Sequence, residues 1–178
     1  MLGDGGTPEI VPEIRDVDGT AMSIGTKDVL ELIRPSQGGH VIFVGARATG
    51  LCASGATLTG RVLFPDGTFV SLESRSLDFE PIEDEPGWGR PDYSSIAGLA
   101  NVPICPNNTG RPLLSIPMVL EVEVEDRQQR VAEARVDISL DCVQTDADCR
   151  ALCECECDQE YDIGVGCDVP EGAECELQ

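Results

Sequence analysis

The sequence predicts an all-β fold in which an antiparallel β-sandwich is followed by a disulfide-rich C-terminal tail. Short apolar runs recur from Thr20 onward with turn residues every 8–15 positions, a spacing typical of sandwiches. Two runs near residue 130 alternate strictly between apolar and polar positions, and seven of the nine cysteines lie after residue 140. We therefore expect a flexible leader or spacer at residues 1–18, a β-sandwich domain at residues 19–143 and an acidic cysteine-rich tail at residues 144–178.

The two alternating runs, residues 120–125 and 132–140, predict an antiparallel pair of strands with one face in water. Leucine, valine, isoleucine and alanine occupy one parity of each run, and mostly charged residues occupy the other. The turn between them, residues 126–130, contains no glycine. The same parity places Cys142 on the buried face where the last strand leaves the sandwich, which makes it a natural anchor for a disulfide.

The remaining strands follow from shorter patterns. Residues 28–34 are too short for a stable helix before Pro35, so we expect a strand there. Residues 40–49 are apolar at both parities, as in a central strand. Residues 57–64 and 68–74 flank a Pro-Asp-Gly turn and form a hairpin.

A segment of about thirty residues, 80–111, separates the two halves and holds five prolines and the single tryptophan. Connections of this length in a compact domain are commonly functional or covering elements. Trp88 and Tyr93 are therefore candidate residues for binding a small ligand.

The charge excludes several partners. A formal net charge of −21 repels phosphate backbones and anionic lipid surfaces, so we expect no nucleic-acid binding and no peripheral membrane binding. No run approaches the roughly 20 apolar residues of a transmembrane segment. A protein or a cell-envelope component is the expected partner.

The cysteines indicate an oxidising compartment, because their abundance is far above cytosolic usage. His40 is the only histidine and lies far from the main cysteine cluster along the chain, which disfavours cysteine–histidine zinc schemes. We expect Cys52 to pair with Cys105, and six of the seven cysteines of the tail region to form three bridges with one left over. The expected disulfide cysteines are Cys52, Cys105, Cys142, Cys149, Cys153, Cys155, Cys157, Cys167 and Cys175.

The centre of the tail combines thiols with carboxylates. In an extended strand Cys153, Cys155 and Cys157 would share one face, so adjacent members should bond elsewhere rather than to each other. Residues 148–154 are expected to form a short helix. A soft-metal site of the three thiolates stays open as an alternative to disulfides, and the carboxylates would suit a hard ion such as calcium in addition to the disulfides. The calcium candidates are Asp146, Asp148, Asp158 and Asp162.

No pattern for side-chain catalysis is present. A single histidine restricts triads and general acid–base chemistry, and the sequence contains neither a G-x-S-x-G elbow nor a phosphate-binding loop. We expect His40 to lie at a solvent edge or to cap a strand. The predicted function is a non-catalytic exported module, structural or adhesive, or a component of a larger extracellular assembly. The alternative is a protein that binds calcium or a small ligand, with no other cofactor.

One stretch resembles a known group of proteins. Residues 19–51, with the apolar run 29–33, the Gln-Gly-Gly-His turn at 37–40 and the strand after it, resemble uncharacterised secreted or lipid-anchored proteins of myxobacteria-like bacteria. The likeness extends to about residue 140. It implies an immunoglobulin-like sandwich and an extracellular, periplasmic or outer-membrane-tethered location, and it transfers no functional residue. Residues 1–6 lack the pattern of an export signal, so we expect that a signal has been removed and that the precursor could carry a lipid anchor.

Overall fold

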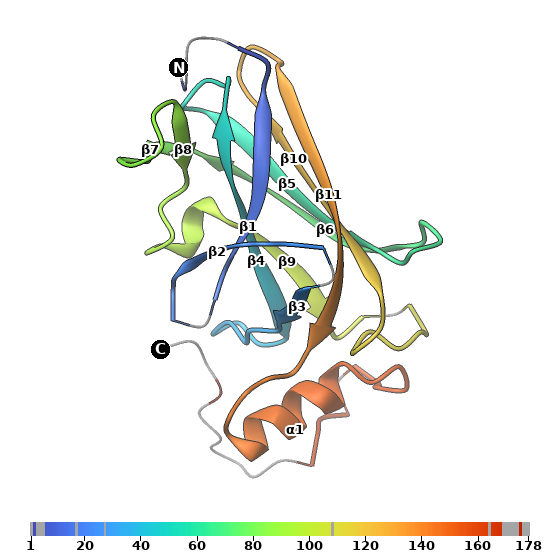
Figure 1. Cartoon of the computed structure of the whole chain (residues 1–178). Coiled ribbons are helices and arrows are strands. Elements are labelled where there is room, and N and C mark those ends of the chain that lie inside the picture. The colour runs from blue at the N-terminus through green and yellow to red at the C-terminus, as the bar shows by residue number, and fades with distance from the viewer. Residues whose placement is uncertain are drawn as a thin grey trace.

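The computed structural model describes residues 2, 6–16, 18–26, 28–107, 109–163, 165–168 and 175. Two β-sheets pack face to face, and a single α-helix, α1 (Ala147–Glu156), lies at one end of them (Figure 1). The predicted all-β sandwich is confirmed. Parts of the expected leader (1, 3–5 and 17) and of the tail (164, 169–174 and 176–178) lie outside the described residues.

The first sheet is built around the central strand β4. Its order is β2-β1-β4-β8-β7, and β9 also pairs with β4. The strands are β1 (Glu9–Arg15), β2 (Ala21–Ser23), β4 (His40–Thr49), β7 (Glu80–Pro81), β8 (Trp88–Arg90) and β9 (Ala100–Cys105). Strand β4 is apolar at both parities, as predicted, because both faces of this sheet are covered.

The second sheet has the order β3-β11-β10-β5-β6. Its strands are β3 (Asp28–Glu31), β5 (Ala56–Leu63), β6 (Phe69–Leu77), β10 (Met118–Glu125) and β11 (Val131–Asp141). The pairing of β10 with β11 is antiparallel, which confirms the alternation argument, whereas β3 joins β11 in parallel. The hairpin of β5 and β6 is also confirmed.

The core lies between the inner faces of the two sheets. Ile42, Val44 and Leu120 are among its fully buried members. Gly60 of β5 permits a close approach of the two sheets, because a Cβ there would lie 2.8 Å from a methyl of Val102 on the other sheet. Every second residue of β4 points into this core, and His40, the first residue of the strand, is one of them. The histidine therefore lies at the edge of the core.

Two expectations need correction. The expected flexible leader is wrong for residues 9–15, because they form β1 and pair with β4 along seven positions. The segment 80–111 is not one long loop, because it contains β7, β8, a 3₁₀ turn (Ile96–Gly98) and β9. The loop was predicted from the prolines of this segment. Pro103 nevertheless lies in β9, which pairs with β4, because a neighbouring register shift tolerates its missing N–H.

Within the part of the chain that the structure describes, α1 is the only α-helix, and no helix there has the length and apolar character needed to cross a membrane.

The turn between β10 and β11 is held by a carboxylate instead of a glycine. Asp126 accepts hydrogen bonds from the backbone N–H groups of Gln128 and Arg130 at 2.8 and 3.1 Å. Gln129 has a φ of 61°, a conformation that a side chain disfavours.

We predict that Gln129→Gly stabilises the protein by about 0.5 kcal/mol, because glycine removes the strain of a positive φ but loses more entropy on folding. Urea unfolding under non-reducing conditions measures the change. Gln128→Gly is the matched control and should not stabilise, since Gln128 is not among the non-glycine residues with positive φ. Equal effects of the two substitutions would contradict this account.

Candidate functional site

Four disulfides converge on α1 and the residue that follows it. They join Cys105 to Cys157, Cys142 to Cys153, Cys149 to Cys175 and Cys155 to Cys167. Two of these bridges attach the helix to the sandwich, because Cys105 ends β9 and Cys142 follows β11 directly. The prediction that Cys142 anchors a disulfide is confirmed.

The predicted bridge between Cys52 and Cys105 is wrong. The expected leftover cysteine in the tail region is wrong as well, because all seven cysteines after residue 140 are bonded. Cys105 pairs in register with His40 at the start of β4, while Cys52 follows the far end of the same strand. Ten residues of extended strand span roughly 30 Å, so the two thiols lie at opposite ends of the sheet. Cys52 is the free cysteine, and its sulfur accepts a hydrogen bond from Arg130 at 3.5 Å.

One interpretation of the CECEC run placed its cysteines on an extended strand. In the structure Cys153 and Cys155 lie on α1, and Cys157 follows its last residue. Asp146 caps the helix by accepting from the N–H groups of Asp148 and Cys149. Because Cys153 and Cys157 are four residues apart, they share one side of the helical turn, whereas Cys155 points elsewhere. The three cysteines bond to different partners, as predicted.

His40 is buried, with 1% of its side chain exposed, so the expected role at a solvent edge is wrong. Its Nδ1 lies 3.0 Å from Oε2 of Glu156 on α1, and the other oxygen of Glu156 lies 3.5 Å from Nη2 of Arg34. Residues 34, 40 and 156 thus form a polar link between the helix and the sandwich.

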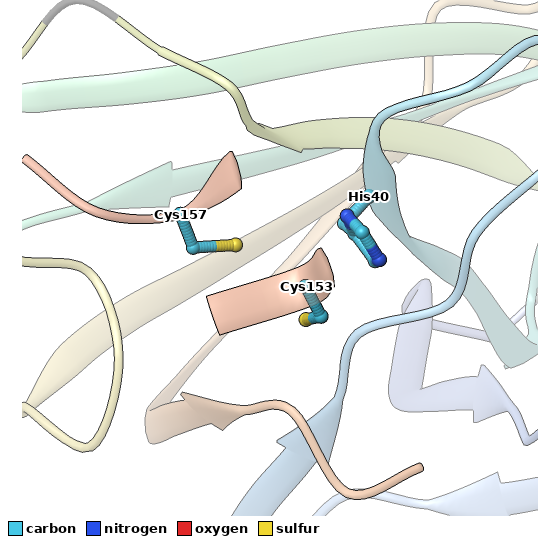
Figure 2. Close-up of side chains that lie close together, drawn as sticks. All are labelled: His40, Cys153 and Cys157. Carbon is cyan, nitrogen blue, oxygen red and sulfur yellow. The ribbon is translucent and has the colours of Figure 1, made fainter. Parts of the chain in front are cut away.

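His40 lies next to two cysteines of the tail region, although its position in the sequence had disfavoured a site shared by histidine and cysteine. A ring nitrogen of His40 and the sulfur atoms of Cys153 and Cys157 all lie within 4.8 Å of one another. Figure 2 shows the three side chains, His40 from the start of β4 and both cysteines from the helical turn opposite it. We call His40, Cys153, Cys157 and Glu156 the His40 cluster.

Two buried polar atoms of this cluster face each other. Nδ1 of His40 and Oε2 of Glu156 lie 3.0 Å apart, and among the described residues neither has another hydrogen-bond partner. An imidazole and the sulfurs of two disulfides, whose free thiols would suit a metal, are therefore gathered beside a carboxylate.

The structure does not bring the four calcium candidates together. Asp146 and Asp148 lie at the N-terminus of α1, and Asp158 and Asp162 follow its C-terminus. A helix of ten residues is about 15 Å long, which is far more than one ion can bridge. Asp146 and Asp158 also accept hydrogen bonds from nearby backbone N–H groups.

Tyr93 and Trp88, the candidate binding residues, take part in packing on the outer face of the first sheet. Tyr93 is buried, and its hydroxyl occupies the space above Gly45, where a Cβ would collide with it. The Trp88 ring lies under the guanidinium of Arg47, 5.5 Å from its centroid. Tyr93 therefore helps to cover this sheet, whereas Trp88 belongs to strand β8 of the sheet itself.

Below Tyr93 lies a buried carboxylate, Glu13, which sequence patterns did not indicate. Burial raises the pKa of Glu13, although the charge of Arg90 and the nearby hydroxyl of Tyr93 act in the opposite direction. Burial also raises the pKa of Tyr93, and the charge of Glu13 adds to this effect. Arg90 reaches Glu13 at 3.2 Å.

Sequence reasoning missed His40 and Glu156 as a pair because they are far apart along the chain. One signal was available, since Cys153, Glu156 and Cys157 fall at spacings of three and four and so share a helix face. Nothing in the sequence showed that this face would pack on His40.

Comparisons with known proteins give little further information. No family model matches the chain, and no curated protein matches it. Among solved structures, the crystal structure of CopC from Methylosinus trichosporium OB3b aligns with 68% of this chain and 89% of its own, at 13% identity and a TM-score of 0.31. At so low a TM-score the likeness carries no argument about function.

We predict that Glu13 makes the protein less stable as the pH rises above its ordinary pKa of 4.5. The folded state holds the proton more tightly than the unfolded state, so stability is fully present below the unfolded pKa and falls through the raised pKa. Urea unfolding across this range should show wild type losing stability relative to Glu13→Gln as the pH rises.

Tyr93→Phe provides a second variant, because it removes the hydroxyl whose proximity lowers the pKa of Glu13 and should extend the loss to higher pH. A difference between wild type and Glu13→Gln that stays constant with pH would contradict the assignment.

Proposed function

We propose that this chain is an exported, non-catalytic module that serves as a structural or adhesive component of a larger extracellular or cell-envelope assembly. The observation that carries the proposal is the set of four disulfides that fasten α1 and the tail to one end of the sandwich. Such a set persists in oxidising compartments and is reduced in an ordinary cytosol. The strongly acidic composition suits a protein that stays dispersed outside the cell.

The arrangement of the reactive groups supports a non-catalytic role. The sulfurs near His40 are bonded to other cysteines, so they cannot attack a substrate, and the ion-pair partner of His40 is a carboxylate. Glu13 and Tyr93 are buried and contact each other. These groups hold the fold together instead of facing a substrate.

The outer face of the second sheet is the surface that supports partner binding. Residues 91–99 pack with Tyr93 and Leu99 on the outer face of the first sheet, whereas the second sheet presents a shallow groove across β5, β10 and β11. Glu121 links Arg61 and Arg135 in this groove, at 3.1 and 3.2 Å. On the neighbouring edge strand β6, Phe69 and Leu72 are exposed. The groove is lined by Thr59, Arg61, Glu121, Val122, Glu123, Glu133, Ala134 and Arg135.

The proposal extends to location and relatives. The disulfides support residence in the periplasm, at the outer membrane or outside the cell, with a lipid tether as one form of attachment. Membership of the uncharacterised secreted immunoglobulin-like proteins that residues 19–51 resemble stays a prediction.

Export predicts one free thiol in the oxidised protein. Material expressed behind an export signal, denatured with a maleimide and without reductant, should take up one label per chain, at Cys52. Cys52→Ser should then take up none. The same chain kept in a reducing cytosol should label at all nine cysteines. Several labels on the exported chain would contradict the proposed compartment.

Partner binding is tested by cross-linking in native envelopes. The chain has 33 acidic residues and one lysine, so a reagent that joins its carboxylates to partner amines is the suitable choice. We expect cross-links at Glu123 and Glu133 of the groove. Glu123→Lys with Glu133→Lys should abolish them, whereas Glu9→Lys, on the other sheet, should not. A chain that stays monomeric and uncross-linked in the envelope would contradict an assembly role.

A further inference from the structure

We propose that the reduced form of this chain binds one zinc ion at the His40 cluster and that disulfide formation releases the ion. The ligands are His40, Cys153 and Cys157, with a fourth thiolate from Cys105 or Cys142. The inference goes beyond the proposed function because it concerns the chain before its cysteines are oxidised.

The distances fit a small tetrahedral ion. The nitrogen and the two sulfurs lie within 4.8 Å of one another in the oxidised structure. Zinc binds sulfur at about 2.3 Å and nitrogen at about 2.0 Å, which places tetrahedral ligands roughly 3.5–3.8 Å apart. A contraction of about one ångström, within reach of side-chain rotation, completes the geometry.

The supply of ligands also fits. Cys105 is bonded to Cys157 and Cys142 is bonded to Cys153, so reduction of these two bridges leaves four thiols beside one imidazole. Structural zinc sites use four ligands of these two kinds. The other two bridges involve Cys149 and Cys155 with tail residues and are not needed for the site.

Burial and polarity supply an independent argument. His40 and Cys153 are almost completely buried, and Nδ1 of His40 lies 3.0 Å from Oε2 of Glu156. This contact occupies Nδ1 and leaves Nε2 as the ring nitrogen that a metal ion would use. A buried imidazole with two sulfur atoms within 4.8 Å of a ring nitrogen offers the kinds of ligand that zinc prefers.

Glu156 is then a positioning residue. Histidines that bind metals commonly donate the other ring N–H to a carboxylate, which fixes the ring and its tautomer. Glu156 lies beside the imidazole at 3.0 Å and is itself held by Arg34. Three thiolates, one zinc ion and a neutral imidazole carry one net negative charge, and Arg34 lies close enough to offset the added charge of Glu156.

The redox step balances with a dithiol as reductant. Each bridge takes up two electrons and two protons and becomes two thiols, while the dithiol becomes a disulfide. Zinc binding displaces the protons of the three thiols that coordinate it. In the reverse direction an oxidised disulfide accepts the electrons, the cysteines pair as in this structure, and the ion leaves because its thiolate ligands are gone.

The test uses the full chain carrying Cys52→Ser, reduced with a dithiol that is then removed under anaerobic conditions. Cobalt(II) serves as the spectroscopic probe for the zinc site. We expect one equivalent to bind with intense visible bands of tetrahedral geometry and thiolate charge-transfer absorption. One equivalent of zinc should displace it. The oxidised chain should show neither signal.

Variants assign the site. His40→Ala should weaken cobalt and zinc binding at least tenfold, and Glu156→Gln should weaken it by a smaller factor. Cys155→Ser with Cys167→Ser, which removes a bridge outside the cluster, should leave affinity unchanged. Zinc should also raise the thermal midpoint of the reduced chain, since a ligand that binds only the folded state stabilises it, and this rise should vanish in His40→Ala.

The proposal is overturned if the reduced chain gives no tetrahedral cobalt spectrum, or if His40→Ala binds as tightly as its parent. It is also overturned if the Cys155 and Cys167 double variant loses binding to the same extent as His40→Ala, because binding would then belong to an unfolded cysteine-rich chain. None of these outcomes changes the number of free thiols in exported protein, so the proposed function is judged separately.

Discussion

Two disulfides, Cys105 to Cys157 and Cys142 to Cys153, hold α1 against the end of the sandwich where β4 begins, and the position of the His40 cluster depends on them. Residues 141–178 carry twelve acids and one arginine, so this region cannot bury enough apolar surface to order itself. A bridge that spans 52 residues restricts the unfolded chain by about 4 kcal/mol on the loop-entropy model. Covalent constraint therefore replaces hydrophobic packing in this part of the molecule.

The two buried polar clusters divide the molecule into an anchored end and a covered face. At the anchored end His40, Glu156 and Arg34 connect the helix to the sandwich. On the covered face Glu13 of β1 pairs with Arg90 of β8, and Tyr93 lies above Gly45. Both clusters are internal, so the exposed sheet surface is the outer face of the second sheet. Ion pairs of Glu121 with Arg61 and Arg135 keep that face hydrophilic.

Local patterns predicted most of the fold, since alternation, turn residues and parity act over a few positions. They indicated the strands β4, β5, β6, β10 and β11, the short helix and the anchoring role of Cys142. Contacts between distant residues were not predictable in this way. Cys105 was assigned the wrong partner because its register with His40, and not its place in the chain, decides which thiols it meets. The buried state of His40 depends likewise on the docking of a helix more than a hundred positions later.

The order of the pairings has a consequence for biogenesis. None of the four bridges joins two cysteines that are consecutive in the sequence, because Cys105 skips to Cys157 and the other three pairs each enclose at least one further cysteine. In a polypeptide that crosses a membrane with its N-terminus first, the thiols meet an oxidant in sequence order, which favours bridges between neighbouring cysteines such as Cys52 and Cys105. On the proposed export, native pairing therefore involves reshuffling of early bridges, a step that disulfide isomerases catalyse.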